Sequence, residues 1–218
     1  MTDGFPAAYR EGSAGFFRRE FAVDERVLIP RPETEHLVED GLEFLRSSQT
    51  PRVLDAGTGS GAIACTIAAE VPAARVTATD LSEGALAVAR SNAERLGVSG
   101  RCTFVLADIA PPGAGPFDLI VANLPYIPSA DVPSKPDPVG YEPRQATDGG
   151  ADGMDQYRKL LAAAPGLLAP GGLLLMEGAP PTMGALNALA LAAFPHAKVT
   201  VHRDYARLER YVRVATAR

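Results

Sequence analysis

Four consecutive residues, Asn123, Leu124, Pro125 and Tyr126, offer the groups needed to hold a planar NH2 group for chemistry at its nitrogen. The side-chain oxygen of Asn123 can accept one N–H, and the carbonyl of Leu124 can accept the other. Two such bonds would fix the rotation of the group and free its lone pair from conjugation. Pro125 locks its own φ and favours an extended Leu124, while Tyr126 offers a flat ring for stacking. An ordinary Asn-Pro turn with a core tyrosine is the alternative.

A glycine-rich turn follows the short apolar run 52–55 and precedes a helical pattern. Glycine lets a backbone approach a ligand closely and adopt positive φ. NAD-binding folds share this pattern, so the turn alone leaves NAD open, whereas no Gly-Lys-Ser/Thr follows for a phosphate loop. Asp55 would repel a pyrophosphate but suits the α-ammonium group of S-adenosylmethionine. The turn residues predicted to contact this cofactor are Gly57, Thr58, Gly59, Ser60 and Gly61.

Two more acids end apolar runs downstream of the glycine turn. Asp80, with Leu81 beside it, is predicted to accept the ribose hydroxyls of the cofactor, as acids do at this position in many nucleoside-binding folds. Asp108 is predicted to take the adenine amine while Ile109 packs on the ring. The alternatives are a helix N-cap for Asp80, a role that Ser82 can already fill, and a solvated turn residue for Asp108.

Short apolar runs alternate with helical patterns from about Pro51, which is typical of a parallel sheet with crossover helices. We therefore expect an α/β, Rossmann-like domain with helices on both faces. The carboxyl ends of its strands would gather the residues above at one edge, where ligands bind in open α/β sheets. The expected strands are 52–55, 75–79, 102–106, 118–122, 172–177, 197–202 and 208–214, and the expected helices are 62–70, 83–96, 155–168 and 183–193.

Two regions depart from this alternation. Residues 1–48 are expected to form a small extension with two short β pieces, around 16–17 and 21–27, and a helix with Pro32 in its first turn that runs to about residue 45. Residues 49–218 are expected to form the main domain. Within it, the proline-rich stretch 126–152 is predicted to be an ordered loop over the carboxyl edge of the sheet.

The composition excludes several classes of protein. The net charge is −5, with cations scattered among more numerous acids, so we expect no stable binding of nucleic acid. No apolar run has the roughly 18 residues of a membrane helix, and no signal peptide is evident, which predicts a cytoplasmic protein without membrane contact. His36, His196 and His202 lack acids or cysteines at ligand spacing, so no metal is predicted. Cys65 and Cys102 are expected to be buried thiols.

Several longer segments make the chain closely similar to the HemK/PrmC family of protein-(glutamine) N-methyltransferases, which act on peptide release factors. The segments are 21–23 with 27–35 and its Arg-Pro-Glu-Thr-Glu, the glycine motif 55–62, 117–123, Tyr-Glu-Pro-Arg at 141–144, 148–153, and 203–205 with 209–210. The resemblance implies a seven-stranded methyltransferase fold of class I and contacts with the substrate amide at Asn123–Tyr126. It also implies S-adenosylmethionine as cofactor, with contacts at Gly57–Gly61, Asp80, Ile109 and Asn123. It further implies a glutamine-bearing peptide or protein, such as a class-1 release factor, as partner.

The chain departs from the family pattern in three places. Leu124 stands where the family has proline, and Asn-Leu-Pro-Tyr is similar to the motif of ribosomal-RNA adenine dimethyltransferases. Only about twenty residues precede the hairpin, where the family carries a helical domain, so a short form is expected. The strand end at Glu177 lacks the glutamine that often follows it.

We therefore predict methyl transfer to a carboxamide nitrogen, that of a glutamine in a protein or peptide. The alternatives are an amide in a small molecule or natural product, a nucleobase amine, and a cofactor-binding module without catalysis. The last would bind the cofactor without turnover on any amide.

Overall fold

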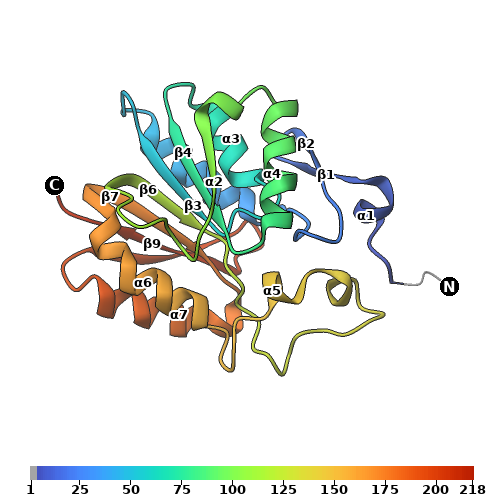
Figure 1. Ribbon diagram of the computed structural model, residues 1–218. Coiled ribbons are helices and arrows are strands. Elements are labelled where there is room, and N and C mark those ends of the chain that lie inside the picture. Colours follow the sequence, from blue (N-terminus) through green and yellow to red (C-terminus); the bar gives the residue numbers. More distant parts are fainter. Residues whose placement is uncertain (1–3) are drawn as a thin grey trace.

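Seven strands form the central sheet, in the order β5-β4-β3-β6-β7-β9-β8 (Figure 1). Only β9 runs antiparallel to its neighbours, β7 and β8. The strands are β3 (Arg52–Ala56), β4 (Arg75–Asp80), β5 (Cys102–Leu106), β6 (Phe117–Ala122), β7 (Leu168–Glu177), β8 (Lys198–Arg203) and β9 (Glu209–Ala215). This computed structural model describes residues 4–218. The mostly parallel seven-stranded sheet that the sequence predicts is confirmed.

Helices cover both faces of the sheet, as predicted (Figure 1). On one face, the first apolar core joins alternate residues of β3, β6 and β7 to α2 (Thr34–Leu45) and α3 (Ala62–Glu70), with α4 (Glu83–Arg95) beside them. On the other, the intervening residues of the same strands pack against α6 (Asp155–Leu167) and α7 (Pro180–Ala193). Parallel strands buried on both sides explain the continuous apolar runs in the sequence.

The N-terminal extension of the chain contains an antiparallel hairpin of β1 (Ser13–Phe16) and β2 (Arg19–Ala22). Phe17 and Arg18 both have positive φ, which suits the twist of a two-residue hairpin. The predicted strand over 21–27 is wrong beyond Ala22, because the chain turns and Val27 N donates to the Asp24 carbonyl at 3.1 Å. A short helix, α1 (Ala7–Glu11), was not expected, and residues 1–3 of the extension lie outside the described part.

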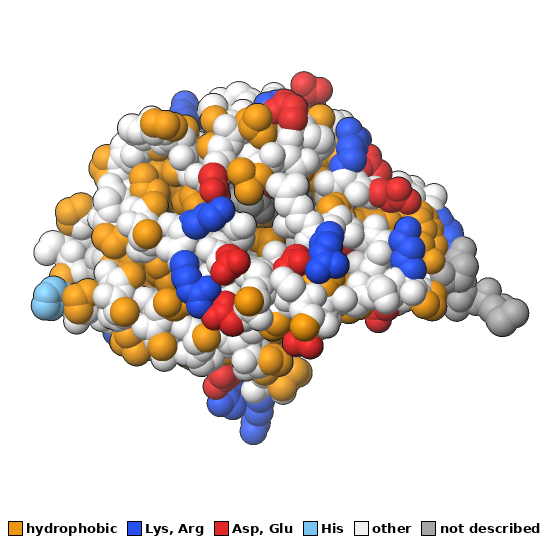
Figure 2. Space-filling view, turned by 60° about the horizontal axis from the view of Figure 1, so that its bottom comes forward, with side chains coloured by type: hydrophobic (Ala, Val, Ile, Leu, Met, Phe, Trp, Pro, Cys, Tyr) orange, Lys and Arg blue, Asp and Glu red, His pale blue; other side chains and the backbone are white. Residues whose placement is uncertain are grey.

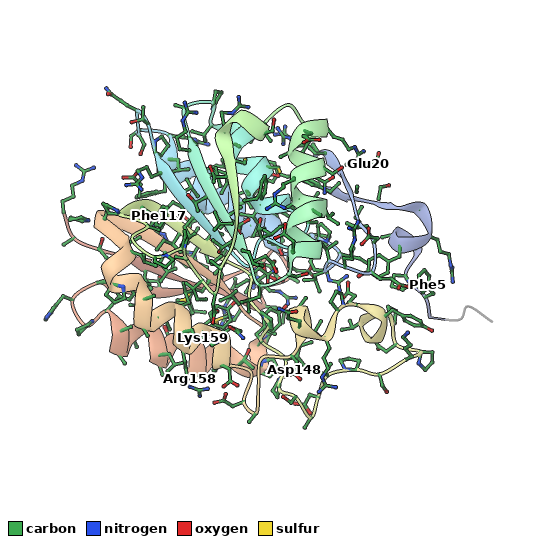
Figure 3. All side chains as sticks on the ribbon, in the orientation of Figure 1. Phe5, Glu20, Phe117, Asp148, Arg158 and Lys159 are labelled. Atoms are coloured by element: carbon green, nitrogen blue, oxygen red, sulfur yellow. The ribbon has the colours of Figure 1, made fainter. Side chains whose placement is uncertain are left out.

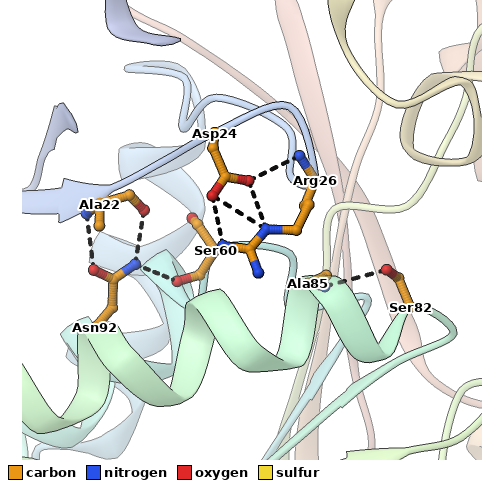
Figure 4. A network of polar contacts seen from close by, with 7 residues as sticks. All are labelled: Ala22, Asp24, Arg26, Ser60, Ser82, Ala85 and Asn92. Atoms are coloured by element: carbon orange, nitrogen blue, oxygen red, sulfur yellow. Dashed lines mark hydrogen bonds and ion pairs between the residues drawn. The ribbon is translucent and has the colours of Figure 1, made fainter. Parts of the chain in front are cut away.

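Asn92 ties this extension to the main domain (Figure 4). It is buried on α4, where its Oδ1 accepts from Ala22 N at 2.8 Å and its Nδ2 donates to Ala22 O at 2.9 Å. The same Nδ2 also donates to the Ser60 carbonyl at 2.9 Å. One side chain therefore satisfies the backbone at the end of β2 and in the glycine turn.

Several element boundaries differ from those expected. The helix predicted to include Pro32 begins at Thr34, after a turn in which Glu35 N donates to the Pro32 carbonyl at 3.1 Å. Strand β7 begins at Leu168 rather than residue 172, because a register shift lets Leu168 pair with Phe117. Helix α7 begins three residues earlier than expected, with two prolines in its first turn.

The proline-rich stretch 126–152 is an ordered loop that contains a 3-10 turn, Pro138–Tyr141, and the short helix α5 (Arg144–Thr147). Its two ends meet where Ile127 pairs with Asp148. In Figure 1 this loop lies beyond the ends of β3 and β6, beside α6.

Candidate active site

A cleft, partly open to solvent, lies at the carboxyl edge of β3, β4 and β6. The residues predicted for chemistry from four separate parts of the sequence meet there, as expected for this edge of a parallel sheet. Those that line the cleft are Gly57, Thr58, Gly59, Ser60, Asp80, Leu81, Asp108, Ile109, Asn123, Leu124 and Pro125. Three predicted residues, Asp55, Gly61 and Tyr126, are not part of its lining.

The glycine turn begins directly after β3. Gly57 N and Thr58 N both donate to the Thr79 carbonyl on β4, at 2.9 and 2.8 Å. Gly57 has φ +74°, and a Cβ there would come within 2.7 Å of Leu124 Cδ2. Gly61 has φ +80° and faces α4, where its Cβ would lie 3.0 Å from Ala89 Cβ. The first glycine therefore lets the turn meet the tetrapeptide, and the last lets α3 pack against α4.

Asp55 stands behind the turn and is fully buried. Its Oδ2 accepts from Thr58 Oγ1 at 2.7 Å and from Ala64 N at 3.1 Å, which ties the turn to α3. Its Oδ1 has no hydrogen-bond partner among the described residues. Burial raises the pKa of this carboxyl to about 7, against the opposing effect of the Thr58 and Ala64 hydrogen bonds.

Asp80 ends β4 at the cleft. Its Oδ2 accepts from Gly59 N at 2.9 Å and its Oδ1 from Ser82 N at 2.9 Å. The carboxylate therefore holds the glycine turn and the start of α4, while partial burial raises its pKa. The N-cap of α4 is Ser82, whose Oγ accepts from Ala85 N at 3.1 Å, so Asp80 is not needed for capping.

Asp108 and Ile109 follow β5. The exposed carboxylate of Asp108 accepts a hydrogen bond from Lys159 Nζ at 2.9 Å. Lys159 lies on α6 and is labelled in Figure 3. Ile109 is buried with φ +66°, an unusual conformation for a β-branched residue. The buried Thr79 hydroxyl donates to the Ile109 carbonyl at 2.6 Å and fixes this conformation. Strain of this kind is often found at ligand sites.

The tetrapeptide follows β6, and two of its residues have hydrogen bonds that the sequence did not reveal. Asn123 Nδ2 donates to Thr34 Oγ1, the first residue of α2, at 3.1 Å. Leu124 N donates to the Tyr157 hydroxyl on α6 at 3.2 Å. Tyr126 packs against the core beside α6 and α7, and burial raises its pKa. Its ring therefore lies below the cleft rather than along its wall.

Glu177, at the end of β7, is buried, and its backbone carbonyl accepts a hydrogen bond from the Tyr157 hydroxyl. Its Oε2 has no hydrogen-bond partner among the described residues. Burial raises the pKa of Glu177 to about 7. Sequence reasoning placed Thr34 only at the border of the cofactor pocket, by family resemblance, and assigned no role to Tyr157 or Glu177, although an acid that ends a fully apolar strand was a signal that could have been used.

Two segments that resemble the family but have no evident role in the chemistry, 27–35 and 141–144, contact each other. The Arg31 guanidinium donates to the Glu142 carboxylate, and Ile29 N donates to Glu142 Oε1 at 3.1 Å. Glu142 is buried, and its side chain is 1% exposed. Because Arg31 and Pro143 both line the cleft, this ion pair joins the N-terminal extension to the loop 126–152 at the cleft wall.

Cations and acids are interleaved on the face of the molecule drawn in Figure 2, so no basic groove for a nucleic-acid backbone is present there. Among residues 4–218, no group of three or more His, Cys, Asp and Glu side chains is placed to bind a metal ion. No helix in the same residues is long and apolar enough to cross a membrane. Both cysteines are free thiols, with Cys65 buried and Cys102 partly so.

Comparison with known proteins identifies the family to which the chain belongs. A family model described as a methyltransferase domain matches residues 53–134. The release factor glutamine methyltransferase of Moorella thermoacetica is 46% identical over 208 residues, which are 95% of this chain and 74% of that protein. The chain belongs to the release factor glutamine methyltransferase family. The corresponding protein of Chlorobaculum tepidum is 45% identical over 95% of this chain and 73% of its own length.

A solved structure agrees with this membership. The release factor-specific protein-(glutamine-N5) methyltransferase of Alicyclobacillus acidocaldarius is 31% identical, with a TM-score of 0.56, and the match covers 91% of this chain and all of that one. The fold is that of the class I methyltransferases, and the methyl donor is S-adenosylmethionine. The residues at this site fit the donor: in the cleft the glycine turn gives close backbone approach and Asp80 ends β4, and behind the turn the buried Asp55 Oδ1 lacks a partner among the described residues.

Proposed function

We propose that this methyltransferase methylates the side-chain amide nitrogen of a glutamine, within the Gly-Gly-Gln segment of a class-1 release factor. The observation that carries the proposal is the position of Asn123–Pro125, which lines the same cleft as the glycine turn and adjoins it at Gly57. An amide nitrogen held by the tetrapeptide would therefore lie beside the methyl donor. The printed activity of the family's members supports glutamine as the acceptor.

For the donor, we propose that the glycine turn, Gly57–Gly61, receives the methionine part and that Asp80 accepts the ribose hydroxyls. Leu81 and Ile109 would border the nucleoside, and Asp108 would accept from the adenine amine while Lys159 holds its carboxylate. The bound donor supplies a methyl group on a positively charged sulfur. For Asp55 we propose that the unpartnered Oδ1 takes the α-ammonium group, in addition to the support that Oδ2 gives the turn.

For the acceptor, we propose that Asn123 Oδ1 and the Leu124 carbonyl each accept one N–H of the glutamine amide. These two bonds hold the nitrogen with its lone pair facing the donor, and such preorganised contacts are among the larger contributions to catalysis. Pro125 keeps the Leu124 carbonyl in place, and Tyr126 supports the motif from the core. The nitrogen would form its bond to the methyl carbon as the bond between that carbon and the sulfur breaks, leaving a neutral thioether. It would then release its proton to solvent, so no side chain is required as a base.

A small-molecule amide is the second candidate, because the cleft is open enough to admit one and the acceptor groups recognise only the NH2. A nucleobase amine is disfavoured by the interleaved charges around the cleft. For location, we propose the cytoplasm, where release factors act.

A transfer assay with labelled S-adenosylmethionine tests the proposal. The acceptors are a class-1 release factor with its Gly-Gly-Gln motif and the same protein with that glutamine replaced by alanine. We expect label on the first and none on the second, with the added methyl located on the glutamine by mass spectrometry. Equal labelling of both would place the methyl on another residue. Label on neither, with the cofactor bound, would exclude this substrate.

A further inference from the structure

Ile109 lies at the centre of a tight turn at the end of the cleft that is proposed for adenine. Ala110 N donates to the Asp108 carbonyl at 2.9 Å, and Ile109 between them has φ +66°. A hydrogen bond from residue i+2 back to residue i around a positive φ is the pattern of the rare, strained form of the γ-turn. A β-branched residue is an outlier in this region of φ, so another contact has to stabilise the turn.

Thr79, on β4, supplies that contact. It is fully buried, and its hydroxyl donates to the Ile109 carbonyl at 2.6 Å. The preceding residue, Ala78, belongs to the first apolar core, so Thr79 points to the opposite face of the sheet, where Ile109 packs in the second core. The hydrogen bond therefore holds the peptide group that follows Ile109 from inside the sheet.

The backbone of Thr79 holds the other wall of the donor site. Its carbonyl accepts from Gly57 N and Thr58 N in the glycine turn, at 2.9 and 2.8 Å. Thr79 itself does not line the cleft. The two polar groups of one buried residue thus fix two separate segments that do line it, and its side chain acts on the turn 108–110 alone.

The conformation of this turn determines what the cleft presents at its nucleoside end. Asp108 and Ile109 both line the cleft. Because φ of Ile109 sets the direction of the chain from Asp108 to Ala110, relaxation to a negative φ would move the two lining side chains relative to each other. A strained conformation that is held by a dedicated hydrogen bond at a ligand site is therefore evidence of a function for that bond.

We propose that Thr79 is a positioning residue for the methyl donor, whose hydroxyl keeps the turn 108–110 in the conformation that presents Asp108 and Ile109 to adenine. The inference rests on the proposed donor contacts of these two residues and adds one that does not touch the donor. Without the hydroxyl the turn relaxes in most molecules, and the apparent affinity falls with the fraction that keeps the binding conformation.

Isothermal titration calorimetry of the full chain with S-adenosylmethionine tests this. Thr79→Val replaces the hydroxyl by a methyl group and leaves the carbonyl that holds the glycine turn. We expect the Kd to rise about tenfold, as when about a tenth of the molecules keep the binding conformation. Thr79→Ser, which restores a hydroxyl, should recover most of the affinity. In steady-state methylation, Thr79→Val should raise the KM for the donor and leave kcat at saturating donor unchanged.

Thr66→Val is the matched control for the loss of a buried hydroxyl. Thr66 is buried on α3, outside the cleft, and its Oγ1 has no partner among the described residues. This variant should keep the wild-type Kd. If Thr79→Val also kept it, the positioning role would be excluded.

A double-mutant cycle with Ile109→Gly separates the turn from a general effect on the fold. Glycine adopts positive φ without steric cost, so the turn in Ile109→Gly no longer depends on the hydroxyl. Ile109→Gly weakens binding by itself, but adding Thr79→Val should then change the Kd by less than about twofold. A tenfold loss in both backgrounds would mean that Thr79 acts through the glycine turn or through stability, and the proposal would fail.

A crystal structure of cofactor-free Thr79→Val gives a readout that needs neither donor nor acceptor. We expect Ile109 at negative φ in the predominant conformer, and an unchanged positive φ would overturn the proposal. If the turn relaxed while the Kd stayed at its wild-type value, the donor contacts of Asp108 and Ile109 would be refuted, and the positioning role with them. The binding and structural measurements do not involve the acceptor, so a release factor that is not labelled would overturn only the proposed substrate.

Discussion

Gly57 and Leu124 approach so closely that any side chain on residue 57 would meet Leu124 Cδ2 at 2.7 Å. The contact joins the turn proposed for the methyl donor to the motif proposed for the acceptor. A shift of either segment therefore changes the distance between the two halves of the cleft.

Gly57→Ala should weaken cofactor binding by at least about tenfold. Alanine at φ +74° costs about 1–2 kcal/mol, and its Cβ would displace the turn or Leu124. Isothermal titration calorimetry with S-adenosylmethionine measures the effect. Gly12→Ala is the control, since Gly12 has φ +71° but open space around its Cα, away from the cleft. Equal loss of affinity in both variants would mean that strain alone, rather than the contact with Leu124, is responsible.

Asn123→Ala should lower kcat by about 100-fold or more, because it removes one of the two acceptors that orient the amide. Cofactor affinity should change little. Single-turnover methylation of the release factor, with cofactor affinity measured separately, distinguishes these effects. Asn187→Ala on α7, outside the cleft, serves as control. Unchanged turnover in Asn123→Ala would refute the assigned mechanism.

Asp80→Ala should raise the Kd for S-adenosylmethionine by at least about tenfold, which corresponds to about 1.4 kcal/mol. The variant loses the proposed ribose contact and also releases Gly59 N and Ser82 N. Asp118→Ala is a useful comparison, since Asp118 also accepts from a backbone N–H, that of Arg52 at 2.7 Å, but away from the cleft. A cofactor affinity that falls equally in both would point to a general loss of stability.

Asp55→Asn should remove part of the protein's dependence of stability on pH. The Asp55 pKa rises from 3.8 to about 7 on folding, so the folded state binds the proton between about pH 4 and 7 while the unfolded state has lost it. The contribution to stability is full below about pH 4 and declines as pH rises through this window, by on the order of 4 kcal/mol.

Urea denaturation of the cofactor-free protein at pH 5.5 and pH 8 measures this effect. We expect the difference in unfolding free energy between wild type and Asp55→Asn to shift in favour of the variant at pH 8. A difference that is equal at the two pH values would mean that Asp55 is ionised in the folded protein throughout.

Glu142→Ala should loosen the loop 126–152, because Arg31 and Ile29 N lose their shared partner. We expect faster tryptic cleavage after Arg144, in α5, and a higher KM for the protein acceptor, since Pro143 and Ala146 line the cleft. Glu83→Gln breaks an exposed ion pair with Arg90 on α4 and should have neither effect. A resistant loop in Glu142→Ala would show that other contacts, such as the Ile127–Asp148 pairing, are sufficient to hold it.

The parts of the fold that depend on local pattern were predictable from sequence. Apolar runs predicted the seven strands, because burial on both faces leaves a direct trace in composition. Residues that end neighbouring strands were correctly expected to meet, since the parallel topology brings them to one edge. This explains why Asp80, Asp108 and Asn123 line one cleft.

What the sequence did not reveal depends on contacts between distant segments. The bond between Thr34 and Asn123 joins residues 89 positions apart, and no spacing rule predicts it. The sequence also did not reveal that Asp55 Oδ2 accepts from Thr58 Oγ1 and Ala64 N, because the buried start of α3 needs an acceptor there. The five-residue helix α1 is too short to leave a periodic pattern.

The acceptor site is assembled from three separate stretches of the chain, around Thr34, Asn123 and Tyr157. Apart from Asn123, every residue proposed for the cofactor lies between Asp55 and Ile109. During synthesis on the ribosome, the donor half of the cleft is thus almost complete in sequence about fifty residues before Tyr157 is added. The hydrogen bond that holds Leu124 can therefore form only after α6 has left the exit tunnel.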